Sequence, residues 1–304
     1  MRSQQVTESH LLTKFIIKQF HYSHTEKSNM STINIQKKNP DTPVKLAILC
    51  CDSPQHFDLI ERLHKEFEVQ GVVMETDKNQ MDWLWKKGRY KLWFYRRYHS
   101  IRRRWMGHSA HRKSFFPTTF DLETSGIPTH YAFNINERAT AKFLKKIKPD
   151  ITIVCGTMYV GKRARKAGNN IINLHGGVLP EYKGNQCIFF ALHEKAYDKI
   201  GATIHLVTEV LDGGSVISIV KPQITPNDND ETLYAKSIKL CILKLIDLLK
   251  TYDSGESLTA HSQPPSKKKT FSHKDRTPWV ELKHAIDRWS GKSIPKEMNR
   301  LPTN

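Results

Sequence analysis

Residues 150–177 read DITIVCGTMYVGKRARKAGNNIINLHGG, and this stretch decides the fold that we expect. Residues 150–155 and 170–174 are short apolar runs with the length of buried strands. The basic stretch between them, which ends near Ala167, is typical of a helix. A strand, a helix and a second strand in this order form a crossover between parallel strands.

The same alternation extends along the chain in both directions. Further apolar runs have strand length, at residues 44–51, 69–74, 128–133 and 201–207. Other segments place apolar side chains at helical spacing, at residues 54–67, 136–147 and 231–251. The sequence therefore predicts an α/β protein with a Rossmann-like, open and mostly parallel sheet that carries helices on both faces. Such a sheet binds ligands beyond the carboxyl ends of its strands.

Composition divides the chain into three parts. Residues 1–43 are polar without a clean period, so we expect a flexible leader, with Met30 as an alternative start. Residues 44–251 carry the alternation and form the expected catalytic domain, with a basic aromatic helical insert at 80–113. Within this insert a single helix is expected from about residue 80 to residue 106. Residues 252–304 form a short C-terminal extension, polar and loop-like up to residue 276 and helical at 278–289.

Positive charge is concentrated in the insert. The chain of 304 residues has a formal net charge of +18, and residues 86–113 contain 11 Lys and Arg without an Asp or Glu. Aromatic side chains are interleaved with these charges. The pattern fits a surface helix whose aromatic residues pack on the domain, or a site for a phosphate-bearing ligand. It also fits a surface that binds an anionic membrane, whereas nucleic acid is a less expected partner.

Composition also excludes several classes of protein. No apolar stretch approaches the roughly 20 residues that cross a bilayer, and residues 1–30 lack the apolar segment of a secretory signal. Five Cys is an odd number, and most of them lie in apolar runs, which indicates a reducing compartment and a cytoplasmic protein. Neither Cys-x-x-Cys nor His-Glu-x-x-His occurs, so no metal site is expected.

Polar side chains gather at the ends of two predicted strands. Asn173 and His175 lie two residues apart, so they share one face of a strand, and Thr203 and His205 do the same on the next strand. Asp212 follows in a Leu-Asp-Gly-Gly turn. An amide donor, an imidazole and a carboxylate together suit acyl transfer, because they can stabilise an oxyanion and move a proton.

The residues beside this set agree with attack by an external amine. Gly176 and Gly177 carry no side chains, so a substrate can approach the backbone. No Ser or Cys is placed as an obvious nucleophile. Taken singly, each His and the Asp-Gly-Gly turn also have ordinary structural explanations. The joint pattern is what indicates a catalytic site.

The stretch INLHGGVLPEYKG at 172–184 resembles the central motif of the folate-dependent formyltransferases, which act on glycinamide ribonucleotide, methionyl-tRNA or amino sugars. GATIH at 201–205 and LDGGSVI at 211–217 resemble the second and third blocks of that family at the right spacing. The similarity extends over roughly 46–251 and is strong at 150–219. It implies a Rossmann-like fold and formyl transfer with 10-formyltetrahydrofolate as co-substrate, without a metal.

The resemblance also implies roles for individual residues. Asn173 and protonated His175 would donate hydrogen bonds to the oxyanion, and Asp212 would accept the proton of the amine. His205 matches the second His of the family. The folate would be bordered by Gly156, Met158, Tyr159 and Val160 on one side and by Leu211 on the other.

The acceptor amine is constrained by two departures from known relatives. Residues 51–55 read CDSPQ where glycinamide ribonucleotide formyltransferases hold a phosphate with Gly-Ser-Asn, and Asp52 would repel a phosphate. Only 53 residues follow Thr251, too few for the C-terminal barrel of methionyl-tRNA formyltransferase. We therefore expect a nucleotide-linked amino sugar of surface polysaccharide synthesis, with Lys183 and Asn185 as substrate contacts.

The sequence is also consistent with other acceptors and other functions. The amine could belong to hydroxyornithine or to aminoacyl-tRNA, since the insert could clamp an RNA backbone. A non-catalytic protein that keeps the fold, or a basic nucleic-acid-binding protein, is a further alternative. A homodimer through residues 279–289 is also consistent with the sequence.

Overall fold

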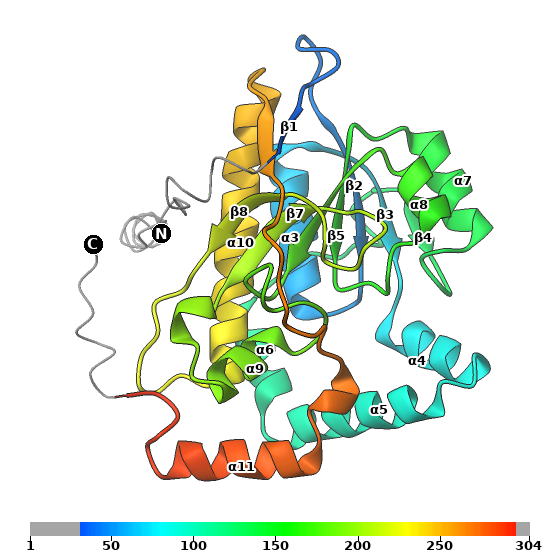
Figure 1. Cartoon of the computed structure of the whole chain (residues 1–304). Helices are drawn as coiled ribbons and strands as arrows, with labels where there is room; N and C mark the ends of the chain where they lie inside the picture. The colour runs from blue at the N-terminus through cyan, green and yellow to red at the C-terminus, as the bar shows by residue number, and fades with distance from the viewer. Residues whose placement is uncertain (1–30, 296–304) are drawn as a thin grey trace, which may run out of the picture.

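The computed structural model describes residues 31–295 and contains one continuous sheet with helices on both of its faces (Figure 1). Within these residues the strand order is β1-β9-β8-β7-β6-β5-β2-β3-β4. The strands are β1 (Thr32–Ile35), β2 (Lys45–Cys50), β3 (Glu68–Met74), β4 (Thr129–Tyr131), β5 (Ile151–Cys155), β6 (Asn170–His175), β7 (Ala202–Leu206), β8 (Val216–Val220) and β9 (Leu258–His261).

Helices connect and cover these strands (Figure 1). The α-helices are α3 (Pro54–Glu66), α4 (Asp77–Lys86), α5 (Tyr90–Trp105), α6 (His108–Phe115), α7 (Arg138–Ile147), α8 (Lys162–Ala167), α9 (Cys187–His193), α10 (Asp230–Asp253) and α11 (Pro278–Trp289). Two short 3₁₀ turns, η1 (Tyr197–Lys199) and η2 (His273–Asp275), complete the described elements. No helix within residues 31–295 is long and apolar enough to cross a membrane.

The sheet has a parallel half and an antiparallel half. Strands β6, β5, β2, β3 and β4 are parallel neighbours, whereas β6–β7, β7–β8, β8–β9 and β9–β1 pair antiparallel. Every residue of β5 is buried, as a parallel strand covered on both faces requires. The predicted α/β fold is therefore confirmed, and the change of direction falls between the two strands that carry the candidate catalytic residues.

Apolar side chains form a core on each face of the sheet. On one face, Leu59 and Leu63 of α3 and Ile242 and Leu249 of α10 pack against the strands. On the other face, Leu144 of α7 belongs to a second buried cluster that also contains side chains of α8. Two packed layers hold the sheet rigid, so the ends of its strands provide fixed positions for a site.

The expectation of a flexible leader up to residue 43 is wrong for its last part. Strand β1 pairs antiparallel with β9, which lies in the C-terminal extension that was expected to be loop-like. Lys37 Nζ also lies 2.7 Å from Asp253 Oδ1. The pairing depends on a partner from the other end of the chain, which local sequence pattern does not reveal. Residues 1–30, and with them Met30, lie outside the described residues.

The insert forms three helices where one helix was predicted from residue 80 to residue 106. Gly88 and Gly107 separate α4, α5 and α6, and they adopt φ values of 65° and 72°. These left-handed conformations are easily adopted by glycine and end a helix. The three helices therefore turn around one end of the molecule and do not form a single rod (Figure 1).

Gly214 lies in the tight connection between β7 and β8, where a Cβ atom would come within 1.8 Å of the Leu206 carbonyl oxygen. Because that oxygen belongs to the backbone, it cannot swing aside. Gly214→Ala should therefore destabilise the fold by roughly 1–3 kcal/mol. Urea unfolding would measure the change, with Ser215→Ala as a control that adds no atom. Equal unfolding midpoints for the two variants would contradict this packing argument.

Candidate active site

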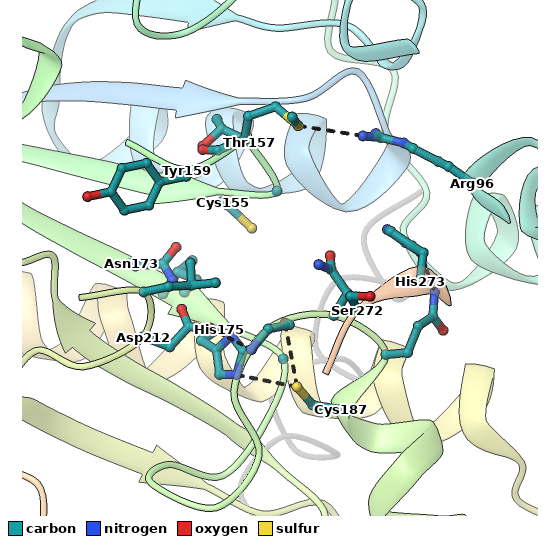
Figure 2. Close-up of a pocket in the computed structure, with 18 of the residues that line it drawn as sticks. Arg96, Cys155, Thr157, Tyr159, Asn173, His175, Cys187, Asp212, Ser272 and His273 are labelled. Atoms are coloured by element: carbon teal, nitrogen blue, oxygen red, sulfur yellow. Dashed lines mark hydrogen bonds and ion pairs between the residues drawn. The ribbon is translucent and has the colours of Figure 1, made fainter. Parts of the chain in front are cut away.

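A cavity of about 530 Å³ opens beyond the carboxyl ends of β5 and β6. The insert and the C-terminal extension supply part of its lining, including Arg96, Arg103, Ser272 and His273. Figure 2 shows Asn173, His175 and Asp212 on one side of this space and Arg96 and His273 across from them. The position agrees with the general rule for ligand sites of open α/β sheets.

The pairing of β6 with β7 brings the polar side chains together. Asn173 lies directly opposite His205 in the antiparallel register, and His175 lies opposite Thr203. The Thr203 hydroxyl donates to the Gly177 carbonyl at 2.7 Å and so ties the turn after β6 to β7. The four predicted catalytic residues, Asn173, His175, His205 and Asp212, all line the cavity.

His205 orients the amide of Asn173. Its Nδ1 atom lies 2.8 Å from the Leu206 carbonyl oxygen, which can only accept, so Nδ1 carries the hydrogen. The other ring nitrogen, Nε2, then accepts a hydrogen bond from Asn173 Nδ2 at 3.0 Å. One amide hydrogen of Asn173 is used in this contact, and the second is left for a ligand. His205 therefore acts on Asn173 as a positioning residue.

A backbone carbonyl also fixes the ring of His175. Its Nε2 atom donates to the Tyr182 carbonyl at 2.8 Å, because that oxygen can only accept. The second ring nitrogen, Nδ1, lies 3.7 Å from Asp212 Oδ2. Nδ1 is thus the nitrogen of His175 that can exchange a proton next to Asp212.

Asp212 is a buried carboxylate that stays ionised. Burial alone would raise its pKa, but the neighbouring His175 and the Gly184 backbone N–H, which donates to Oδ2 at 2.7 Å, together hold the pKa below its usual value. The residue adopts φ 51° in its turn, a conformation that Asp and Asn tolerate better than most residues. The carboxylate is therefore fixed between two imidazoles.

The predicted folate-binding residues also line the cavity. Gly156, Met158, Tyr159 and Val160 follow β5, and Leu211 comes from the turn before β8. Sequence reasoning missed what anchors this loop. Glu75, which is fully buried, accepts from the Met158 N–H at 2.8 Å and from the Ile135 N–H at 2.8 Å. Glu75 directly follows strand β3, and a carboxylate at the end of a buried strand was the one sequence feature that could have indicated this anchoring role.

Two of the four predicted substrate contacts line the cavity and two do not. Gly176 and Asn185 line the cavity, whereas Gly177 and Lys183 do not. A Cβ atom at Gly177 would meet the Cys187 Cβ at 2.6 Å, so this glycine is needed for close packing of the chain and not for access by a ligand. The Lys183 carbonyl accepts from the Phe271 N–H, which ties the residue to the C-terminal extension.

Cys187 is a neighbour of the site that the sequence did not reveal. Its Sγ atom lies 3.7 Å from His175 Nε2, as Figure 2 shows. Burial raises the pKa of the Cys187 thiol well above its usual value, and Asp212 raises it further. The thiol therefore stays protonated, and a protonated thiol is a poor nucleophile.

The cavity carries an excess of positive charge that comes mainly from the insert. Its lining contains six Arg against three carboxylates. Most of these guanidinium groups have acidic partners: Arg96 pairs with Asp77, Arg112 with Glu231, and Arg102 and Arg276 with Glu281. Within residues 31–295, Arg89 and Arg103 form no ion pair. The pKa of Arg103 is lowered by burial and by the nearby charge of Arg112.

Comparisons with known proteins agree with this geometry. Residues 99–242 match the sequence model of the family described as Formyl transferase, a segment that contains β5, β6, β7 and the candidate catalytic residues. The chain thus shares its site-bearing segment with the formyl transferase family, as the resemblance implied. No metal-binding group of His, Cys, Asp and Glu occurs among the described residues.

Individual relatives match over limited lengths. A methionyl-tRNA formyltransferase of Listeria innocua is 31% identical over 144 residues, which are 47% of this chain and 46% of that relative. Formyltetrahydrofolate deformylase 1, mitochondrial, of Arabidopsis thaliana is 30% identical over 139 residues, 43% of this chain and 42% of that relative. The chain thus spans less than half the length of these curated relatives.

Solved structures share a lower sequence identity with this chain than these relatives do. The crystal structure of glycinamide ribonucleotide transformylase 1 from Symbiobacterium toebii has a TM-score of 0.49 and 17% identity, over 69% of this chain and 88% of that chain. Similarity of this degree bears on neither substrate nor activity.

The depressed pKa of Asp212 predicts how stability depends on pH. A carboxyl group whose native pKa lies below its unfolded value of about 3.9 stabilises the fold above that value and loses the contribution as pH falls. Wild type should therefore be more stable than Asp212→Asn at pH 7, by roughly 1–3 kcal/mol. The difference should shrink as the pH falls below about 4. Urea unfolding of both proteins across this range would reveal it, and a difference that does not change with pH would contradict the assignment.

Proposed function

We propose that this chain is an enzyme that transfers a formyl group from 10-formyltetrahydrofolate to a primary amine. The observation that carries the proposal is the meeting of Asn173, His175 and Asp212 in one cavity. An amide, an imidazole and an ionised carboxylate are the groups that an acyl transfer to an amine requires. The family match over residues 99–242 supports the same chemistry.

The cavity suits a folate and an amine together. Its volume of about 530 Å³ falls within the range of roughly 300–1,000 Å³ for small-molecule sites. Met158, Val160 and Leu211 would supply apolar walls for the pterin. When bound, 10-formyltetrahydrofolate supplies the activated formyl group.

The side chains have separable roles in the proposed reaction. Asn173 has one amide hydrogen free of His205 and would donate it to the oxygen that becomes negative as the amine attacks. Protonated His175 would donate from Nδ1, because its Nε2 atom is occupied by the Tyr182 carbonyl. Asp212 would accept the proton that the amine loses, directly or through water, and return a proton to the leaving nitrogen.

A nucleotide-linked amino sugar is the acceptor that we propose, as part of surface polysaccharide synthesis. Such a molecule carries a diphosphate, and arginine is the preferred side chain for phosphate oxygens. Arg103 is half-buried, lines the cavity close to Arg112 and forms no ion pair within residues 31–295, so a phosphate there would restore a balance of charge. Gly176 and Asn185 are the predicted contacts for this substrate that line the cavity. All five cysteines are free and buried, which supports a reducing, cytoplasmic setting.

Aminoacyl-tRNA and hydroxyornithine are the competing acceptors. The relatives named methionyl-tRNA formyltransferases favour the first, and the basic insert is compatible with an RNA backbone. Hydroxyornithine carries no phosphate, so it does not account for Arg103, whose guanidinium forms no ion pair within residues 31–295.

Formation of tetrahydrofolate from 10-formyltetrahydrofolate tests the proposed reaction. Nucleotide-linked amino sugars, hydroxyornithine and aminoacyl-tRNA would be added one at a time. Turnover should need one of these amines, and Asn173→Ala or His175→Ala should lower kcat roughly 100- to 1000-fold, because an oxyanion donor is lost. Cys187→Ala should keep activity, since its protonated thiol takes no part. Absence of turnover with every amine would contradict the proposal.

The role of Arg103 has its own test. Arg103→Gln should raise KM for a nucleotide-linked amino sugar at least about tenfold, because a charged hydrogen bond to phosphate is lost. The rate with the same amino sugar lacking its nucleotide should be unchanged. Lys113→Gln is the matched control, since Lys113 belongs to the same insert but is exposed and outside the cavity lining. An equal effect of both substitutions would contradict a phosphate contact at Arg103.

A further inference from the structure

Helix α5 exposes an apolar stripe on the side that faces away from the cavity. Tyr90, Phe94, Ile101 and Trp105 are all exposed, and their spacing of 4, 7 and 4 residues places them on one face of the helix. The opposite face carries His99, which is buried and contacts the His273 carbonyl. This stripe therefore does not contribute to the core or to the cavity.

Helix α11 exposes a second stripe of the same kind. Trp279, Leu282, Ile286 and Trp289 are spaced 3, 4 and 3 residues apart, and all four are exposed. His284 on the other face is the buried residue of this helix. Trp105 and Trp289, at the ends of the two stripes, are 90% and 91% exposed, which is unusual for the largest apolar side chain.

The two helices lie together at one end of the molecule. Arg102 Nε of α5 lies 3.0 Å from Glu281 Oε1 of α11, and this ion pair sits on the inward side of both helices. Figure 1 shows both helices along the end of the protein that lies beyond α6 and α9. Because their buried faces turn towards the protein body, both stripes point outward. Together the eight residues define what we term the aromatic surface.

Basic side chains flank the aromatic surface. Five of them are exposed and form no ion pair within residues 31–295: Lys91, Arg97, Arg104, Lys283 and Lys292. A band of Trp, Phe and Ile with Lys and Arg at its margins matches the interface of an anionic bilayer, where the rings enter the headgroup region. The acidic residues of these two helices, Glu281 and Asp287, are both half-buried, so the exposed charge beside the aromatic residues is positive and complements anionic lipid headgroups.

We propose that α5 and α11 together dock this protein on an anionic lipid surface through the aromatic surface and its flanking basic residues. The inference does not depend on the proposed formyl transfer, since it rests on residues that lie outside the catalytic set. It adds α11 to the membrane contact that the basic insert alone suggested.

Sedimentation of the full chain with large vesicles tests the proposal. The protein should bind vesicles of equal parts phosphatidylglycerol and phosphatidylcholine, but not vesicles of phosphatidylcholine alone. Trp105→Ser with Trp289→Ser should weaken this binding at least about tenfold, because two interfacial aromatic anchors are lost. Arg97→Gln with Arg104→Gln should weaken it roughly thirtyfold, because two positive charges that attract the anionic lipid are lost. Both effects should be measured at fixed salt.

Tyr131→Ser is the matched control, because Tyr131 is an exposed aromatic residue on β4 and lies outside the aromatic surface. It should bind vesicles as wild type does. Failure of wild type to bind anionic vesicles, or equal binding to neutral ones, would overturn the proposal. A dimer in solution that Trp105→Ser with Trp289→Ser dissociates, without any vesicle binding, would identify the surface as a contact between copies and would also overturn it.

Discussion

The antiparallel pairing of β6 with β7 is the constraint on which the site depends. It places Asn173 opposite His205, and the hydrogen bond between their side chains fixes the amide. The connection that leaves β7 then carries Asp212 back to both imidazoles, where the carboxylate remains ionised despite its burial. The strand direction changes at this point, where the parallel half of the sheet meets the antiparallel half, and side chains from both neighbouring strands face one cavity.

The insert and the C-terminal extension supply the part of the cavity lining that the sheet does not. Arg103 of α5 and His273 of η2 line the cavity, and His99 of α5 contacts the backbone of His273. The same helix therefore contributes charge to the cavity with one face and exposes aromatic residues with the other. This two-sided use explains why basic and aromatic residues alternate so densely at 86–113, a pattern that a helix with a single role would not require.

Much of the fold and the grouping of the candidate site residues could be predicted from the sequence, because the signals were local. Buried strands such as β5 are short apolar runs, and the two-residue spacing of Asn173 and His175 places both side chains on one face. The features that the sequence did not reveal depend on contacts between distant segments of the chain. The pairing of β1 with β9, the anchoring of the 156–160 loop by Glu75 and the approach of Arg103 to the cavity join parts of the chain that no local pattern relates.

The most direct test of the central claim is a crystal structure with a 10-formyl folate analogue that cannot release its formyl group. The account predicts that the pterin lies between the 156–160 loop and Leu211. It also predicts that the formyl oxygen accepts a hydrogen bond from the free amide hydrogen of Asn173, with Asp212 beside the formyl carbon. An analogue bound outside this cavity, or one whose formyl group points away from Asn173 and Asp212, would contradict the account.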